Sequence, residues 1–269
     1  VIPVYDSLYD YKHKIKHVLV RHEQGATHAA QGYARVSGKV GVTLVTSGPG
    51  ATNTLTGIAD AMMDSTPLVV ITGQVASPLL GTDAFQEIDV IGITQPITKW
   101  AYQIRRAEDI AWAVARAFYI ASTGRPGPVV LDFAKDAQVG KVDFEYKPVE
   151  YIRSYQPEPD ICPDCIAKAA ALINQAKKPF CLVGQGVILG HAEQELLEFL
   201  SKNDIPAAAT TLGLSAMPSD FPLNKGMLGM HGNVGPNRKT NECDVLIAVG
   251  MRFDDRVTGD LNTYAKQAK

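Results

Sequence analysis

Polar residues follow directly after short apolar runs at several points of the sequence, which is where ligands bind to parallel α/β sheets. Glu23 is the first such residue, after the apolar run 16–20. A carboxylate at a strand end transfers protons if it is buried, or caps a helix if it lies at the surface. His22 and His28 are too far apart to share a helix face with Glu23 as a zinc-protease motif requires. Position alone leaves proton transfer and helix capping open.

A glycine-rich turn, Thr46-Ser47-Gly48-Pro49-Gly50, leads from the next apolar run into Ala51-Thr52-Asn53. Backbone N–H groups at the start of a helix can bind an anion. The turn is neither a G-x-G-x-x-G motif nor a P-loop, because no Gly-Lys-Ser/Thr follows it. A tight turn with a purely structural role is the alternative.

Two further segments of the first half carry polar or charged residues. The loop from Gly81 to Glu87 contains Phe85 among polar residues, and loops of this type form binding walls or are simply solvated. Arg125 and Lys135 bracket the apolar run 129–133. These cations could bind an anionic ligand, or they could form ion pairs with the nearby Asp132 and Asp136.

In the second half, glycines follow two apolar runs. One segment is Gly184-Gln185-Gly186, and the other begins at Gly250 and continues through Arg252 to Arg256. Glycine permits close approach of a nucleotide to the backbone. Asp254 and Asp255 could bind Mg²⁺, but the adjacent arginines favour a charge-compensated loop.

Cys162 and Cys165 form the only C-x-x-C pair. A zinc site would need a second pair, and a redox dithiol would need a strand directly before the first cysteine. The residues before Cys162 are polar and proline-rich, as in a linker. We therefore expect two reduced cysteines at the entrance of a helix.

Alternation of apolar runs with amphipathic stretches predicts an α/β fold with parallel sheets. The segment 140–160 lacks any sustained period and is typical of a linker between two such domains. Predicted strands are 16–20, 41–46, 68–73, 129–133, 180–184, 205–210 and 244–250. Predicted helices are 26–37, 51–63, 107–122, 163–176 and 192–202.

Composition narrows the classes of function. The 269 residues are 46% hydrophobic and 20% charged, with a net charge of −2, which is typical of a soluble globular protein. Nothing in this balance favours nucleic acid as a partner, and no apolar run approaches the roughly 18 residues of a membrane helix. The chain starts without Met and ends in a polar stretch, so we expect it to be a piece of a longer protein.

Taken together, five stretches resemble the acetolactate synthase (acetohydroxyacid synthase) family of thiamine diphosphate-dependent enzymes. They occur in the family's order along nearly the whole chain. The stretches are Arg21-His22-Glu23-Gln24-Gly25-Ala26, Thr46-Ser47-Gly48-Pro49-Gly50-Ala51-Thr52-Asn53, Gly81-Thr82-Asp83-Ala84-Phe85-Gln86-Glu87, Gly124-Arg125-Pro126-Gly127-Pro128 and Arg252-Phe253-Asp254-Asp255-Arg256-Val257-Thr258-Gly259.

The resemblance implies two doubly wound parallel-sheet domains. Residues 1–145 would bind the aminopyrimidine of thiamine diphosphate, 146–160 would be a linker, and 161–269 would be a Rossmann-like, FAD-binding central domain. Both domains would be truncated at the chain's ends. A third, C-terminal domain that binds the diphosphate and Mg²⁺ would lie outside this chain.

The implied activity is decarboxylation of pyruvate followed by condensation of the two-carbon unit with pyruvate or 2-oxobutyrate, in branched-chain amino acid biosynthesis. The flavin would do no net redox work. The resemblance also implies a homodimer or homotetramer and a possible regulatory small subunit. Because no transit peptide is visible in the sequence, we expect the bacterial cytoplasm, with an organelle as the alternative if a leader precedes Val1. Alternatives are another thiamine-dependent 2-oxo acid carboligase or decarboxylase, or a noncatalytic flavin-binding module.

The resemblance also assigns individual residues. Glu23 would hydrogen-bond the pyrimidine nitrogen with a pKa raised by burial, and Gln86 would lie near the cofactor's reactive end. Thr46, Pro49 and Asn53 would complete the pyrimidine pocket. Phe85, Lys135 and Arg256 would line the substrate channel, with Arg256 facing the acceptor's carboxylate. The implied FAD contacts are Arg125, Gly184, Gly186, Thr210, Thr211, Leu212, Gly229, Met230, His231, Gly250 and Arg252. No metal ligand is expected in this chain.

Two positions depart from the family pattern. Gln185 stands where the family usually has a glycine, and Ala76 stands where it often has a proline. The first departure bears on how closely a flavin approaches the backbone.

Overall fold

Two four-stranded sheets organise the chain, one in each of two separate units. The structure, a computed structural model, describes residues 1–269. The units are Val1–Pro159 and Asp160–Lys269. Every strand pair in both sheets is parallel, so the predicted fold class of two parallel α/β domains is confirmed.

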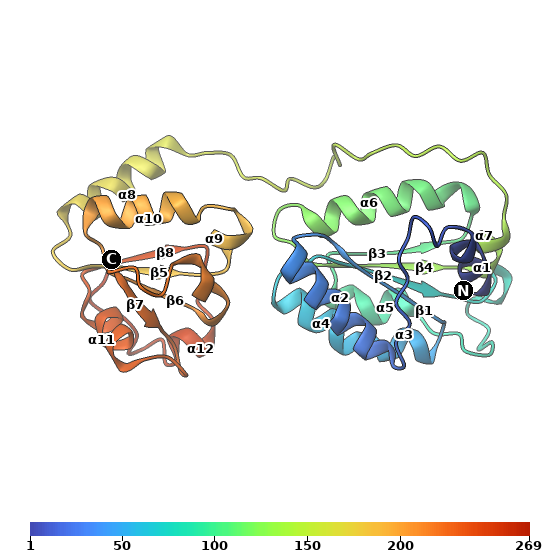
Figure 1. Cartoon of the computed structure of the whole chain (residues 1–269), viewed down its shortest axis with the longest axis horizontal. Helices are drawn as coiled ribbons and strands as arrows, with labels where there is room; N and C mark the ends of the chain where they lie inside the picture. Colours follow the sequence, from blue (N-terminus) through green and yellow to red (C-terminus); the bar gives the residue numbers. More distant parts are fainter. The chain divides into compact units, whose positions relative to one another are not determined.

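The first sheet has the strand order β1-β2-β4-β3 (Figure 1). Its strands are β1 (Gly41–Val45), β2 (Leu68–Gly73), β3 (Trp100–Ile104) and β4 (Pro128–Phe133). Because all four are parallel, their carboxyl ends lie along one edge of the sheet. We call these ends, with the residues that follow them, the unit-1 edge.

Helices cover both faces of the first sheet. Val70 and Val130 face one side and pack with Ile58, whereas Val69 and Leu131 face the other side. Successive side chains of a strand point to opposite faces, so strands covered on both faces must be apolar throughout. The helices of this unit are α1 (Ile2–Asp10), α2 (Glu23–Ser37), α3 (Pro49–Asn53), α4 (Leu55–Met63), α5 (Val90–Thr94), α6 (Ile110–Ser122) and α7 (Lys135–Val139), with 3₁₀ turns at Ser77–Leu79, Gln95–Ile97 and Ala107–Asp109.

Local signals set the ends of α2. His22 caps its start, because the Gln24 backbone N–H donates to His22 Nδ1 at 3.2 Å. Gly38 ends it in the left-handed conformation, with φ +68°. The predicted helix 26–37 therefore begins one turn earlier than expected. The predicted helix 51–63 is divided in two at Thr54.

One predicted strand is wrong and another strand was missed. Residues 16–20 form no strand, and Val18 and Leu19 are exposed. A strand needs a neighbour's backbone to satisfy its hydrogen bonds, and this apolar run has no strand beside it. Strand β3 escaped prediction because its sequence, Trp-Ala-Tyr-Gln-Ile, mixes polar and aromatic residues at the edge of the sheet.

Most of the segment 140–160 lacks regular structure, but its second half packs on the first unit. Ile152 is buried in the core beside α6. The Tyr155 hydroxyl donates to Thr123 O at 2.7 Å, and Lys99 Nζ donates to that hydroxyl at 2.9 Å. These contacts anchor the chain as it leaves the first unit.

The second sheet has the strand order β7-β6-β5-β8. Its strands are β5 (Pro179–Val183), β6 (Ala207–Ala209), β7 (Asn224–Met227) and β8 (Val245–Val249). The chain moves outward from β5 to β7 and then returns to the other side of β5. The strand order therefore reverses between β5 and β8, and open α/β sheets bind ligands at the carboxyl ends of such strands. We call these ends, with the residues that follow them, the unit-2 edge.

Helices also cover both faces of the second sheet (Figure 1). Leu196 and Leu200 of α10 pack on one face, whereas Leu228 and Val257 pack on the other. The helices are α8 (Pro163–Gln175), α9 (Gly186–Leu189), α10 (Glu193–Asn203), α11 (Val234–Glu242) and α12 (Asp255–Thr258), with a 3₁₀ turn at Thr211–Ala216. None of the helices in either unit has the length and hydropathy needed to cross a bilayer.

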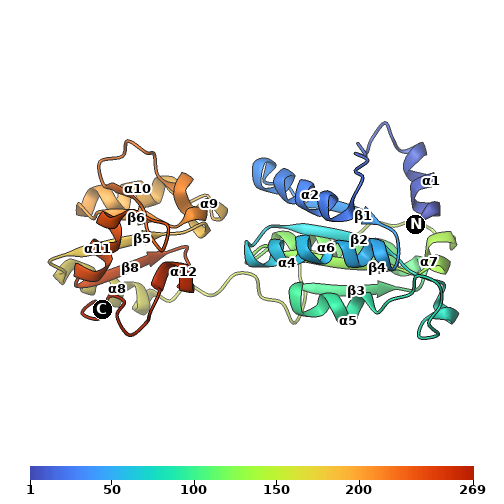
Figure 2. The same cartoon turned by 90° about the horizontal axis from the view of Figure 1, so that it is seen from below.

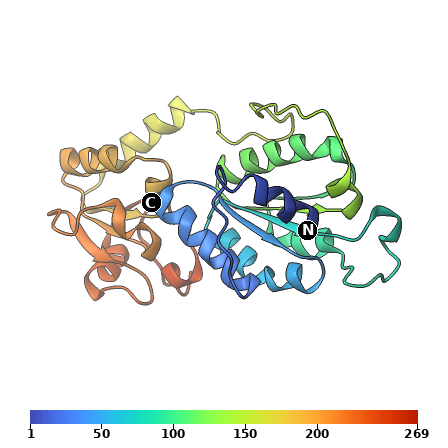
Figure 3. The same cartoon turned by 45° about the vertical axis from the view of Figure 1, so that its right-hand side comes forward.

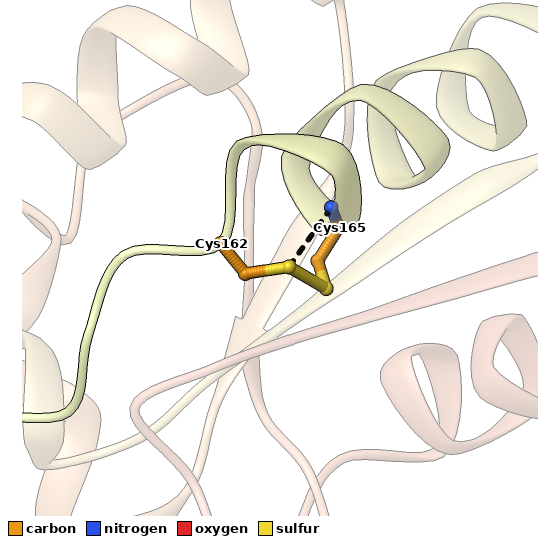
Figure 4. The surroundings of a disulfide bond; sticks show 2 residues. All are labelled: Cys162 and Cys165. Atoms are coloured by element: carbon orange, nitrogen blue, oxygen red, sulfur yellow. Dashed lines mark hydrogen bonds between the residues drawn. A yellow bond between two sulfur atoms is a disulfide. The ribbon is translucent and has the colours of Figure 1, made fainter.

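The expectation of two reduced cysteines is wrong. Cys162 and Cys165 form a disulfide at the start of α8 (Figure 4). Their Cα atoms lie 5.2 Å apart, within the usual range for a disulfide, because the first helical turn brings residues i and i+3 together. Cys162 Sγ also accepts a hydrogen bond from the Cys165 N–H at 3.2 Å. The cysteines are therefore a local cross-link that also caps the helix.

Candidate functional site

Glu23 and Asn53 meet at the unit-1 edge. Glu23 is the first residue of α2 and Asn53 the last of α3, and Asn53 Nδ2 donates to Glu23 Oε2 at 3.0 Å. The Asn53 hydrogen bond lowers the pKa of the Glu23 carboxyl, which is only partly buried. The expected rise in the pKa of Glu23 depends on an apolar cofactor ring placed beside it, so it stays a prediction.

The glycine-rich turn brings Gln86 and Glu23 to the same place. Gly48 has φ +56°, and a Cβ there would lie 2.8 Å from Gln86 O. A Cβ on Gly50 would lie 2.8 Å from Thr46 Cγ2 and 3.7 Å from Glu23 Oε1. Both positions therefore exclude a side chain for steric reasons, and Gly48 also requires a backbone conformation that favours glycine.

Glu87 organises the loop that carries Gln86 and Phe85. Its carboxylate accepts hydrogen bonds from the backbone N–H groups of Gly81, Thr82 and Ala84, the last two at 3.2 Å. These bonds, led by that of Gly81, lower the pKa of Glu87. The loop extends away from the strand ends (Figure 2, Figure 3), and its residue Phe85 is 88% exposed. The structure thus fixes the loop's turn and leaves the aromatic ring in solvent.

A buried polar network lies beneath this edge. Asp132 of β4 pairs in register with Thr72 and Gln103 on the neighbouring strands. Its carboxylate accepts hydrogen bonds from Thr72 Oγ1 at 2.7 Å, Gln103 Nε2 at 2.9 Å and Gln74 Nε2 at 3.2 Å. Burial raises the pKa of Asp132. Gln74 also donates to Ile88 O at 2.8 Å and so ties this network to the end of the Gln86 loop.

The sequence pattern did not predict this network. The available signal was a carboxylate within an otherwise apolar strand, Pro-Val-Val-Leu-Asp-Phe, since a buried charge needs partners. Which partners it finds depends on strand register, which the sequence pattern did not supply.

Arg125 and Lys135 lie at opposite ends of β4, so the idea that both meet one anionic ligand is wrong. Arg125 precedes the strand, where its guanidinium donates to Ser65 Oγ at 2.7 Å and to the carbonyls of Met62 and Met63. Lys135 follows the strand and is exposed at the unit-1 edge. The alternative ion pairs with Asp132 and Asp136 are also absent, because hydrogen-bond donors other than these cations hold both carboxylates.

At the unit-2 edge the predicted residues are brought together by their backbones. Gly184 follows β5 and Gly250 follows β8. A Cβ on Gly184 would lie 2.4 Å from Gly250 O, and one on Gly186 would lie 2.6 Å from Gly250 Cα. The Gly186 N–H donates to Gly250 O at 2.7 Å. These glycines are thus required for the close approach of two chain segments at the reversal of strand order.

Gln185 does not disturb this arrangement. Its φ of −58° and ψ of −27° are right-handed helical values, which any residue adopts. Thr210, Thr211 and Leu212 follow β6 at the same edge, and the Thr210 N–H donates to Val183 O at 2.8 Å. The departure from the family's glycine therefore costs no backbone strain.

A second group at the unit-2 edge contains Gly229, Met230 and Arg256. Gly229 has φ +100°, and the Met230 N–H donates to Arg256 O at 2.7 Å. Arg256 Nη1 donates to Met230 Sδ at 3.5 Å. His231 and Arg252 are exposed and form no hydrogen bond to this group.

The acidic pair after β8 is engaged locally. Asp254 caps α12 by accepting hydrogen bonds from the N–H groups of Arg256 at 3.0 Å and Val257 at 3.2 Å. Asp255 Oδ2 lies 3.8 Å from Arg256 Nε. These contacts favour the charge-compensated loop over a magnesium site. In neither unit do three or more His, Cys, Asp or Glu side chains gather as a metal site would require.

Each of the two units contains a segment that matches a known domain family. Residues 1–93 match the N-terminal TPP binding domain of thiamine pyrophosphate enzymes, and residues 166–269 match the central domain of the same enzymes.

Curated relatives match the chain along its whole length. The acetolactate synthase large subunit of Corynebacterium glutamicum is 52% identical over 269 residues, which are all of this chain and 43% of the relative. The probable acetolactate synthase large subunit of Methanocaldococcus jannaschii is 49% identical over all of this chain and 46% of the relative. The acetolactate synthase isozyme 2 large subunit of Escherichia coli is 48% identical over all of this chain and 48% of the relative.

The chain thus spans less than half the length of these relatives. Across that span its similarity is to acetolactate synthase large subunits. The two domain matches fall one in each unit: the first covers the N-terminal part of unit 1, and the second covers nearly all of unit 2. The chain belongs to the thiamine pyrophosphate enzyme family and is homologous to acetolactate synthase large subunits.

Proposed function

We propose that this chain supplies the pyrimidine-binding and central domains of an acetolactate synthase, which decarboxylates pyruvate and joins the two-carbon unit to a second 2-oxo acid. The observation that carries the proposal is the Glu23 carboxylate, held by Asn53 beside the Gly48–Gly50 turn. Whole-length similarity to acetolactate synthase large subunits supports the same conclusion.

The residues at the unit-1 edge fit the aminopyrimidine of thiamine diphosphate. The cradle combines one carboxylate, one amide, one threonine and a turn without Cβ atoms at two positions. When bound, thiamine diphosphate supplies an electron sink for loss of CO₂ from a 2-oxo acid. Glu23 would hold a proton at a pyrimidine nitrogen. An apolar ring placed against Glu23 removes water from the carboxyl and so raises its pKa from the lowered value in this chain.

The other predicted residues take positions consistent with this role. Thr46 and Pro49 border the cradle, and Gln86 approaches it from the Glu87-organised loop. Phe85 and Lys135 are exposed at the same edge and would exclude water or bind the substrate's carboxylate. Arg256 carries a planar, permanently charged fork that suits the carboxylate of the acceptor.

The unit-2 edge is suited to FAD because the strand order reverses there and the chain offers backbone groups with little side-chain bulk. We propose that Gly184, Gly186, Gly250 and the residues after β6 contact the flavin, which would have a structural role. Arg125 is already held by Ser65 and two carbonyls, so its proposed flavin contact would need a change in these bonds. Mg²⁺ and the diphosphate would be bound by residues outside this chain.

The relatives' names also suggest partners. They are called large subunits, so we propose a regulatory small subunit as a partner and assembly into a homodimer or homotetramer. Pyruvate and 2-oxobutyrate are the proposed substrates.

A chimeric enzyme tests the proposal. In it, this chain replaces the matched segment of the Corynebacterium glutamicum relative. With thiamine diphosphate, Mg²⁺ and FAD, we expect acetolactate to form from pyruvate. Glu23→Gln should reduce kcat by about 10²-fold or more, the usual contribution of a positioned proton-transfer group. Glu108→Gln, at an exposed carboxylate of the first unit, should leave kcat unchanged.

Two results would contradict the proposal. One is a chimera that folds and binds flavin but makes no acetolactate, which would favour the noncatalytic flavin-binding module. The other is a Glu23→Gln chimera that retains the wild-type kcat, since that would leave Glu23 with only a structural role.

A further inference from the structure

Asn237 of α11 holds a single residue of the unit-2 edge by both of its backbone polar groups. The Gly229 N–H donates to Asn237 Oδ1 at 2.9 Å, and Asn237 Nδ2 donates to Gly229 O at 2.9 Å. Asn237 is partly buried. Only a carboxamide side chain offers a carbonyl oxygen and an NH₂ group side by side, and so can pair with the N–H and the C=O of the same residue. A carboxylate lacks the donor, and a hydroxyl has only one oxygen for both roles.

A second asparagine strengthens this attachment one turn earlier. Asn233, which precedes α11, accepts a hydrogen bond from the Met227 N–H through Oδ1 at 3.2 Å, and its own N–H donates to Met227 O at 2.8 Å. The end of β7 and the loop after it are therefore fastened to α11 at two points. Between them lies Leu228, which is buried and whose N–H donates to Ala209 O of β6 at 3.0 Å.

The fastened loop in turn holds Arg256. Gly229 has φ +100°, and a Cβ there would lie 2.8 Å from Arg256 O. The next residue, Met230, donates its N–H to Arg256 O at 2.7 Å and accepts a hydrogen bond from Arg256 Nη1 through Sδ at 3.5 Å. Both ends of Arg256 are thus tied to the residue that follows the one Asn237 holds.

We propose that Asn237 is a positioning residue for Arg256. Asn237 fixes the position of Gly229 and therefore that of the next residue, Met230. Met230 in turn fixes the position of Arg256, because it contacts both the backbone carbonyl and the guanidinium of that residue. The guanidinium would otherwise be free in solvent, because its side chain is 69% exposed and its one carboxylate neighbour, Asp255, is 83% exposed. That Arg256 faces the carboxylate of a 2-oxo acid rests on the proposed function.

The same chimeric enzyme tests the consequence for substrate binding. Asn237→Ala should raise KM for the acceptor 2-oxo acid about tenfold, a change of about 1.4 kcal/mol, with a smaller change in kcat. Asn237→Asp keeps the acceptor oxygen and should fall between Ala and the wild type. In a double-mutant cycle, the Arg256→Lys enzyme should have nearly the same KM with and without Asn237→Ala, since the two changes disrupt the same interaction with the substrate.

Asn241→Ala is the matched control. Asn241 lies one turn further along α11 and accepts a hydrogen bond from the Ala265 N–H at 2.9 Å. It also donates to the backbone carbonyl of Asn237 at 3.2 Å, so its removal leaves the bonds between the Asn237 side chain and Gly229 in place. This variant should lower stability without changing KM. Equal KM values for the Asn241→Ala and Asn237→Ala enzymes, or additive effects in the double-mutant cycle, would overturn the proposal.

A measurement on the 269-residue chain separates this proposal from the proposed function. Amide hydrogen exchange should be about tenfold faster in Asn237→Ala than in the wild type at Gly229 and Met230, and Asn241→Ala should not have this effect. If the wild-type chimera is inactive but exchange accelerates, the proposed function fails and the positioning of Arg256 stands. Unchanged exchange at Gly229 and Met230 would contradict the positioning role whatever the activity.

Discussion

The two strand-end edges of this protein are built in opposite ways. At the unit-1 edge, side chains meet: Asn53 donates to Glu23, and Glu87 holds the loop of Gln86. At the unit-2 edge, backbones meet, because Gly184, Gly186 and Gly250 leave no room for a Cβ. The unit-1 edge therefore presents side-chain functional groups, whereas the unit-2 edge presents backbone N–H and C=O groups. Substitutions should therefore change chemistry at the first edge and folding at the second.

The largest expected effect on stability is at the unit-2 edge. Gly184→Ala should lower the free energy of unfolding by about 3 kcal/mol, because the added Cβ would lie 2.4 Å from both Gly250 O and Met251 Cα, two backbone atoms that cannot move aside easily. Gly235→Ala is the matched control: its Cβ would meet nothing within 4 Å, and in a helix alanine should add up to about 1 kcal/mol. Urea denaturation of the chain measures the free energy of unfolding of both variants. Equal values would show that the lack of space for a Cβ at Gly184 does not matter for folding.

The next effect is beneath the unit-1 edge. Asp132→Ala should lower the free energy of unfolding by about 2 kcal/mol, because it leaves the Gln103 amide and the Thr72 hydroxyl unpaired, although it also removes a desolvated carboxylate. Asp132→Asn keeps the shape and should cost less, because the Thr72 hydroxyl can rotate to accept its new N–H. Thermal or urea unfolding of the three proteins at neutral pH tests the order.

The same residue gives the first sheet a pH dependence of known sign. Burial raises the pKa of Asp132 in the folded state above its unfolded value of about 3.9, so the folded state binds the proton more tightly. Its contribution to stability is present at acidic pH and is lost as pH rises through the raised pKa. The stability difference between wild type and Asp132→Asn should shift in favour of Asn over this range. A difference that is flat with pH would show that Asp132 is not desolvated.

A smaller effect comes from backbone strain at the unit-1 edge. Gln86 has φ +57°, which costs free energy for a residue with a Cβ. Gln86→Gly should therefore stabilise the chain by about 0.5 to 1 kcal/mol while reducing the activity of the chimeric enzyme. Asp83→Gly, at φ +57° in the same loop, should stabilise equally and leave the activity unchanged. Loss of activity in both variants would mean that the loop's conformation matters and the Gln86 side chain does not.

The smallest effect on stability is expected at the Glu23–Asn53 contact. Asn53→Ala should change the free energy of unfolding by less than about 1 kcal/mol, since both groups are partly solvated. It should nevertheless raise the pKa of Glu23 toward its ordinary value, because the largest cause of the lowered pKa is removed. Carboxyl NMR titration of Glu23 measures the shift, with Asn203→Ala in the second unit as the control. An unmoved pKa would show that Asn53 does not hold the carboxylate in solution.

Local sequence determined the fold class and most of the strands. Apolar β-branched runs and helix-capping residues act over a few positions, so β2, α2 with Gly38, and α10 could be predicted directly. The gathering of Glu23, Asn53 and Gln86 was expected from motifs, and the structure brings these residues together around Gly48 and Gly50.

Tertiary structure alone decided which polar groups became partners. Residues 16–20 have a strand's composition but no neighbouring strand, so they form none. Arg125 and Lys135 are close in sequence but separated by the length of β4, because a strand carries its ends apart. Asp132 finds Thr72 and Gln103 through strand register, and Asn237 finds Gly229 through the packing of α11. Periodicity predicts which residues face inward, whereas only the packed chain determines what each of them meets there.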